Sequence, residues 1–96
     1  MTPSQQHYDN ALREVLSKSS LRVLLWRIIV EDCKVFVEDF PMNASAYCLL
    51  AKQEIGKRLL ADLKARDIEA VHKAEQEYND LMERNQQALK ETEGEN

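Results

Sequence analysis

The chain has 96 residues, 44% of them hydrophobic, so its length predicts one small domain and its composition excludes a globally disordered chain. The formal net charge of −4 carries no overall signature of nucleic-acid binding, and no stretch approaches the ~20 apolar residues of a membrane span. Only two glycines and two prolines occur, which favours long helices over β-hairpins.

The first predicted helix begins at about Pro3 and ends at about Ser17. Thr2 is a suitable N-cap, and a proline fits the first turn, where its missing N–H is not needed. The helix carries an apolar stripe with the i, i+3, i+4 spacing of one buried face: Tyr8, Ala11, Leu12, Val15 and Leu16. Serine hydroxyls that follow this stripe compete with helical hydrogen bonds, so the helix is expected to end there.

The second predicted helix covers residues 21–33 and holds the only tryptophan, Trp26. Apolar side chains nearly surround it, which is typical of a central helix buried on more than one side, although its β-branched residues also permit a strand. Residues 35–42 are expected to be irregular because proline disfavours helical geometry in the preceding residue, Phe40. Phe36 and Phe40 are expected to fold back onto the core.

The third predicted helix is capped by Asn43 or Ser45 and ends at about Arg66. Gly56 lies inside this helix at a cost of about 1 kcal/mol relative to alanine, so we expect it to let another helix approach closely, near Trp26. The apolar stripe of the helix comprises Cys48, Ala51 or Lys52, Ile55, Leu59, Leu60 and Leu63. Structural roles are expected for Trp26, Ile29, Ile55, Leu59 and Leu63.

The fourth predicted helix is capped by Asp67, and its stripe begins at Ile68. Two seam positions recur at heptad spacing: Val71, Tyr78 and Asn85 at one, and Ala74, Leu81 and Ala88 at the other. The predicted fold class is all-α, a small bundle of four helices in which the first three pack around the second and the last is long and partly projecting. We expect a helical core domain over residues 1–66 and, over residues 67–96, a C-terminal helix with a frayed acidic tail.

Three segments, in this order and spacing, resemble the Bbp19-like family of short bacteriophage proteins. They are residues 8–16 (YDNALREVL), residues 23–29 (VLLWRII) followed by Cys33 and Phe36, and residues 56–63 (GKRLLADL). The resemblance covers about residues 5–66, and the family typically has a glycine after the cysteine, where this chain has Lys34. It implies a phage origin and a structural or assembly role, with no enzymatic activity to carry over.

Residues suited to catalysis or metal binding are few and scattered. His7 and His72 lie on separate predicted helices, and a histidine with carboxylates one turn away is more often a solvated salt link than a base. Cys33, Cys48 and His72 match no compact zinc spacing, so we expect free buried thiols, with one disulfide left as an alternative. The sequence therefore predicts no catalytic, cofactor-binding or metal-binding residue, and hence no enzyme.

A local basic strip on the third helix is the strongest indication of nucleic-acid binding. It comprises Lys52, Lys57, Arg58, Lys64 and Arg66. Two short helices joined by a turn are able to present such a strip to phosphates. The competing interpretation is that these side chains line the edge of the core with their stems while their charges face water.

The leading expectation is a non-enzymatic phage structural or assembly protein that docks an amphipathic helix face against other phage structural proteins or against further copies of itself. The residues expected to make this contact are Val71, Tyr78, Leu81 and Met82. The protein is expected in the host cytoplasm or the virion, without a cofactor and without a membrane partner. The alternatives are a small nucleic-acid-binding or regulatory protein that uses the basic strip, and a phage inhibitor of a host enzyme.

Overall fold

The computed structural model describes residues 1–39 and 45–94, and this part of the chain is helical without a strand. Its elements in chain order are α1 (Pro3–Ser17), α2 (Ser19–Arg27), the π-helical turn η1 (Ile28–Asp32), α3 (Ser45–Arg66) and α4 (Ile68–Gly94). The all-α prediction is confirmed, and the strand alternative for the second helix is wrong. Phe40 and Asn43, for which a core position and a cap were predicted, lie outside the described residues.

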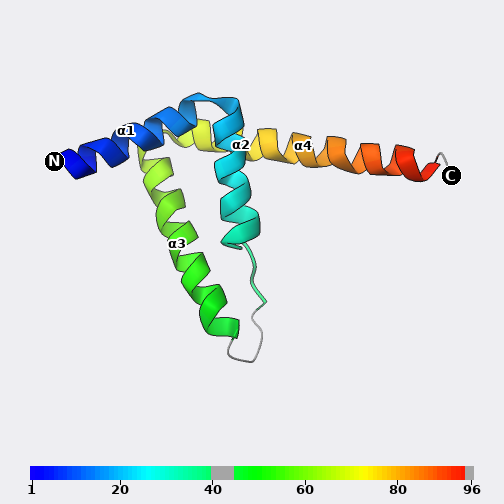
Figure 1. The fold of residues 1–96 in the computed structure, drawn as a ribbon, viewed down its shortest axis with the longest axis horizontal. Coiled ribbons are helices and arrows are strands. Elements are labelled where there is room, and N and C mark those ends of the chain that lie inside the picture. Colours follow the sequence, from blue (N-terminus) through cyan, green and yellow to red (C-terminus); the bar gives the residue numbers. More distant parts are fainter. Residues whose placement is uncertain (40–44, 95–96) are drawn as a thin grey trace.

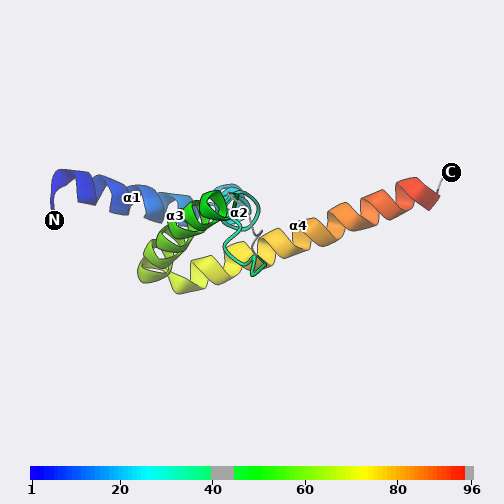
Figure 2. The same ribbon diagram turned by 90° about the horizontal axis from the view of Figure 1, so that it is seen from below.

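The four α-helices form a small, open bundle (Figure 1). α1 and α4 lie along the long axis, with the two termini at opposite ends, and α2 and α3 extend from them to the same side. The principal extents are 59 × 38 × 17 Å. Figure 2 shows the C-terminal half of α4 projecting clear of the other helices, as the prediction of a long, projecting last helix requires.

The helix ends follow from local chemistry. Thr2 accepts a hydrogen bond from the Gln5 backbone N–H, and the Gln5 side chain accepts one from the Thr2 N–H, which together form a capping box. Asp67 is the single residue between α3 and α4, and its carboxylate accepts a hydrogen bond from the Ala70 N–H at 3.1 Å. Both caps are as predicted from the sequence.

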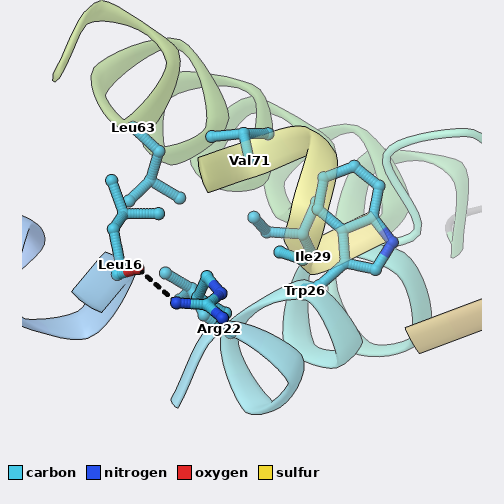
Figure 3. Close-up of a pocket in the computed structure, with 8 residues that line it drawn as sticks. Leu16, Arg22, Trp26, Ile29, Leu63 and Val71 are labelled. Carbon is cyan, nitrogen blue, oxygen red and sulfur yellow. Dashed lines mark hydrogen bonds between the residues drawn. The ribbon is translucent and has the colours of Figure 1, made fainter. Parts of the chain in front are cut away.

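The core lies where α1, α2, η1, α3 and α4 meet (Figure 3). Its central side chains, Ile29 and Val71, are 0% and 2% exposed. The other buried hydrophobic residues are Leu12, Leu16, Trp26, Leu60, Leu63, Ala70, Ala74 and Tyr78. The first half of α4 therefore shares one core with α1, α2, η1 and α3. Backbone helix continues to Gly94, within the region predicted to fray.

Arg22 connects three helices at the edge of this core. Its Nη1 donates a hydrogen bond to the Leu16 carbonyl in the last turn of α1, at 2.8 Å (Figure 3). Its Nε lies 2.9 Å from a carboxylate oxygen of Glu77 on α4, and the Ser19 hydroxyl also donates to Glu77. The Leu16 carbonyl, which has no helical hydrogen-bond partner at the end of α1, thus accepts a hydrogen bond from Arg22. The same side chain connects the turn between α1 and α2 to α4.

η1 ends in a tight turn held by a buried polar side chain. The Cys33 N–H donates to the Ile28 carbonyl at 2.8 Å, and Lys34 follows with φ 53°, in the left-handed region that glycine adopts most easily. Gln53 of α3 is 2% exposed, and its Nε2 donates to the carbonyls of Lys34 and Val37, both at 2.8 Å. The Gln53 amide thus donates hydrogen bonds to two backbone carbonyls of the irregular segment after η1.

The second helix is less enclosed than its composition indicated. Leu24 is 53% exposed, so apolar side chains surround α2 without being buried on every side. Phe36 does return to the core edge, with its ring centroid 5.9 Å from that of Trp26, but it stays 57% exposed. On α1, Tyr8 is 43% exposed instead of buried, because its hydroxyl reaches Asp62 of α3 at the surface.

The buried face of α3 differs from the predicted stripe. Ile55 is 67% exposed, and Cys48 and Ala51 are also exposed, so the structural role predicted for Ile55 is wrong. The residues that α3 buries are Gln53, Gly56, Leu60 and Leu63. The physical reason is that the N-terminal half of α3 lies against the turn after η1, where a small residue and a hydrogen-bonding amide fit better than an aliphatic stripe.

Gly56 provides the close approach that the sequence predicted, but to a different neighbour. A Cβ atom at this position would lie 2.5 Å from Val35 Cγ2 and 2.6 Å from Cys33 Cβ. The approaching segment is therefore the end of η1 and the turn that follows it, not the helix around Trp26. Only a residue without a side chain allows the backbone of α3 to come so near.

Candidate functional site

The interior of the protein has no room for a substrate at the place where the core helices meet. The space enclosed by Leu16, Trp26, Ile29 and their neighbours is about 10 Å³, close to the size of one water probe (Figure 3). Its lining is almost entirely aliphatic and aromatic, apart from the Arg22 stem. This space is a packing defect of the core and offers no concave site for chemistry.

The residues considered for catalysis or metal binding remain apart. His7 and His72 are exposed on α1 and α4, and both cysteines are free thiols, Cys33 half-buried and Cys48 exposed. Within residues 1–39 and 45–94, no three His, Cys, Asp or Glu side chains are grouped so that they could hold a metal ion. Among the helices described there, none combines the length and apolarity needed to cross a lipid bilayer.

A cluster of charged and phenolic groups joins α1 to the end of α3. Asp9 pairs with Arg66 at 2.8 Å and with Arg13 at 3.0 Å, and the Tyr8 hydroxyl donates to Asp62 at 2.9 Å. The hydrogen bond from Arg13 is the main cause that lowers the pKa of the Asp9 carboxyl. Burial raises the pKa of the Tyr8 phenol, and its bond to Asp62 raises it further. These groups are paired with one another, so they connect α1 to α3 and are not poised as catalytic groups.

The structure brings only part of the predicted basic strip together. Arg66 is engaged within the protein, since it pairs with Asp9, donates to the Asp62 carbonyl at 2.7 Å and lies over the Tyr8 ring. The exposed members are Lys52, Lys57, Arg58 and Lys64. At about 100° of helix rotation per residue, Lys57, Arg58 and Lys64 lie within about one third of the circumference of α3, and Lys52 lies outside that sector.

Two of the four residues predicted to bind a partner are buried inside the protein. Val71 is 2% exposed and Tyr78 is 8% exposed, because the first half of α4 packs on α1, α2 and α3. The Tyr78 hydroxyl is also engaged, as it donates to Glu31 at 3.0 Å. The prediction that these two residues are available for contact is therefore wrong. The other two residues lie at the edge of the core. Leu81 is 42% exposed and Met82 is half-buried, so both remain partly accessible to a partner.

The core-facing side of α4 continues past the core, where none of the other helices described in residues 1–39 and 45–94 covers it. We define the α4 distal face as Leu81, Met82, Asn85, Ala88 and Leu89. These residues lie within about one third of the helix circumference, on the same side as the buried Val71, Ala74 and Tyr78. Leu89 is 59% exposed, and Figures 1 and 2 show this part of α4 clear of α1, α2 and α3.

A second apolar surface lies between α1 and α2. It is a depression of about 100 Å³ lined only by aliphatic side chains: Val15, Leu21, Leu24, Leu25 and Ile28. Sequence reasoning missed it because all of these residues had been placed in the core. The signal was present in the sequence, since a helix that is apolar on every side has more apolar surface than three neighbouring helices can cover.

The accessible surface of the chain is larger than that of a compact domain of the same mass. The accessible surface is 7357 Å², against about 5,700 Å² expected for a compact monomer of this mass, an excess of about 1,700 Å². The radius of gyration is 16.5 Å, whereas a compact domain of this length has about 12–13 Å. Both values reflect the open arrangement of the helices and the projecting half of α4.

Comparison of the chain with protein-family models, with curated proteins and with solved structures finds no match.

Proposed function

We propose that this chain is a non-enzymatic bacteriophage structural or assembly protein that acts through protein–protein contacts of the amphipathic helix α4. One observation carries the proposal: the apolar side of α4 that faces the core continues past Met82 to Ala88 and Leu89, where none of the other described helices covers it. A soluble helix seldom retains such a side unless another molecule covers it. The phage context comes from the resemblance of residues 5–66 to short phage proteins.

The open shape supports the same proposal. Contact with another protein would remove part of the excess of about 1,700 Å² of accessible surface and give the projecting half of α4 tertiary support. Most helix stability in proteins comes from packing of an amphipathic face, so such contact would stabilise this half of α4.

The test is to delete the gene from its phage and to compare purified particles by electron microscopy and mass spectrometry. Complete particles are expected to decrease without the chain and to return with the wild-type gene. A gene carrying Gln87→Asp, which places the charge on the opposite side of α4, should restore them, whereas Leu89→Asp should not. Normal particles and normal infectivity without the chain would overturn the proposal.

A further inference from the structure

We infer that two copies of this chain exchange α4 by straightening the single-residue hinge at Asp67, which joins α3 to α4. In the exchanged dimer, the first half of one copy's α4 packs on α1, α2 and α3 of the partner, through the contacts that it makes within one chain. The inference is independent of the proposed function, because it uses the buried half of α4 and leaves the α4 distal face free.

The backbone of the hinge already belongs to a helix on both sides. The Asp67 N–H donates to the Leu63 carbonyl at 3.1 Å, and the Asp67 carbonyl accepts from the Val71 N–H at 3.2 Å. Both bonds have the spacing of four residues that defines an α-helix. The groups left without a helical partner are the carbonyls of residues 64–66 and the N–H groups of residues 68–70, and the Ala70 N–H donates to the Asp67 carboxylate instead.

A straight hinge has more hydrogen bonds than the bent one. Each of the three free carbonyls lies four residues before one of the three N–H groups, so one continuous helix pairs all of them and gives up a single side-chain cap. Residues 57–93 contain neither glycine nor proline, and nothing in this part of the sequence requires a bend. The bend is therefore maintained by tertiary packing against the local preference of the chain.

The contacts that maintain the bend do not depend on which copy supplies α4. Val71 and Tyr78 are buried in the core, Glu77 pairs with Arg22 at 2.9 Å, and the Tyr78 hydroxyl donates to Glu31 at 3.0 Å. A single chain that straightened would lose all of them. Two copies that exchange α4 keep every one and also gain the continuous helix, so the hinge favours the dimer and protein concentration decides how much of it forms.

The exchange closes after two copies. Figure 1 shows α3 and α4 meeting at the hinge and running in different directions. A rotation of 180° about the bisector of the two helix directions converts the direction of α3 into that of α4, and the direction of α4 into that of α3. One straight helix therefore follows α3 and the other follows α4, which gives a two-fold dimer and not an open chain of copies.

Proline at residue 68 separates the two states of the hinge. In the bent chain Ile68 is the first residue of α4 and is 51% exposed, and a proline is well accepted at this position. In a continuous helix the same proline has no N–H for the Lys64 carbonyl and clashes with it. Full-length chains are refolded from urea over a range of concentrations and measured by size-exclusion chromatography with light scattering.

The wild type should form a dimer as its concentration rises, and Ile68→Pro should weaken that dimer by about a hundredfold or more. Ile68→Ala, the matched control, loses the same exposed side chain but keeps the N–H, so it should dimerise like the wild type. A wild-type chain that stays monomeric overturns the inference. An Ile68→Pro chain that dimerises as well as the wild type overturns it too.

The ion pair between α2 and α4 shows whether the helices are exchanged. Arg22→Glu and Glu77→Arg each place like charges at this pair within one chain. When the two variants are refolded together, exchange restores opposite charges at both pairs of a mixed dimer, and native mass spectrometry should find mixed dimers in excess over both pure ones. Mixed dimers no more frequent than random pairing gives, or no dimers, would overturn the inference. The double variant in one chain verifies that the reversed pair is accepted, and if it does not fold, the Ile68→Pro comparison decides.

Discussion

Replacing Gly56 with alanine is expected to destabilise the protein, even though alanine is the better helix former. Gly56 lies in the middle of α3, where helix propensity favours alanine by about 1 kcal/mol. Against this gain, the new methyl group would lie 2.5 Å from Val35 Cγ2 and 2.6 Å from Cys33 Cβ. Both distances are well inside van der Waals contact, so the two segments must separate.

The magnitude follows from which atoms are able to move. Val35 Cγ2 belongs to a side chain that can rotate, but Cys33 Cβ is fixed to its backbone, so α3 itself must shift away from the turn. That shift also weakens the hydrogen bonds from Gln53 to the Lys34 and Val37 carbonyls. Overpacking a close contact costs about 1–3 kcal/mol, and this contact belongs at the upper end, which leaves a net loss of about 2 kcal/mol after the gain in propensity.

The assay is urea unfolding followed by circular dichroism at one fixed protein concentration, because a dimer makes apparent stability depend on concentration. Ala61→Gly, on the exposed side of the same helix, is the matched control and should cost about 1 kcal/mol through propensity alone. If Gly56→Ala instead stabilises the protein by as much as Ala61→Gly destabilises it, helix propensity alone accounts for both changes in stability. The close approach of α3 to Cys33 and Val35 is then refuted.

Three further substitutions test other local features by the same unfolding assay. Lys34→Gly should raise the free energy of unfolding by about 0.5–1 kcal/mol. The reason is that φ is 53° at this residue, and the relief of backbone strain exceeds the entropy that glycine adds to the unfolded chain. A loss of stability would contradict this prediction. Asp67→Ala should lower it by about 1 kcal/mol through loss of the cap on the Ala70 N–H, and an unchanged urea midpoint would refute the cap. Burial, and then the hydrogen bond to Glu31, raises the pKa of Tyr78 above its ordinary value of about 10, so the folded state holds this proton more tightly. Stability should therefore be complete below about pH 10 and fall as the pH rises through the raised value, and Tyr78→Phe should reduce that fall between pH 8 and 11; an equally steep loss in the variant would exclude Tyr78 as its source.

The sequence by itself determined the number of α-helices and the ends of the first, but it predicted the second over residues 21–33, where the structure has Ser19–Arg27 followed by the π-helical turn Ile28–Asp32. A capping residue acts on N–H groups within one turn, so Thr2 and Asp67 could be recognised without knowledge of any distant part of the chain. The heptad positions on α4 likewise identified the side of that helix that carries apolar residues, and with it Leu81 and Met82 of the candidate contact surface.

Only the tertiary structure decided which apolar residues are covered. Val71 and Leu89 share a side of α4 and look alike in sequence, but one is 2% exposed and the other 59%, because α1, α2 and α3 reach only the first half of the helix. In the same way α3 buries Gln53 and exposes Ile55, since the turn after η1 needs a hydrogen-bond donor at that place. Periodicity reports which side of a helix is apolar, whereas burial depends on where distant segments end, and that is a property of the packed chain.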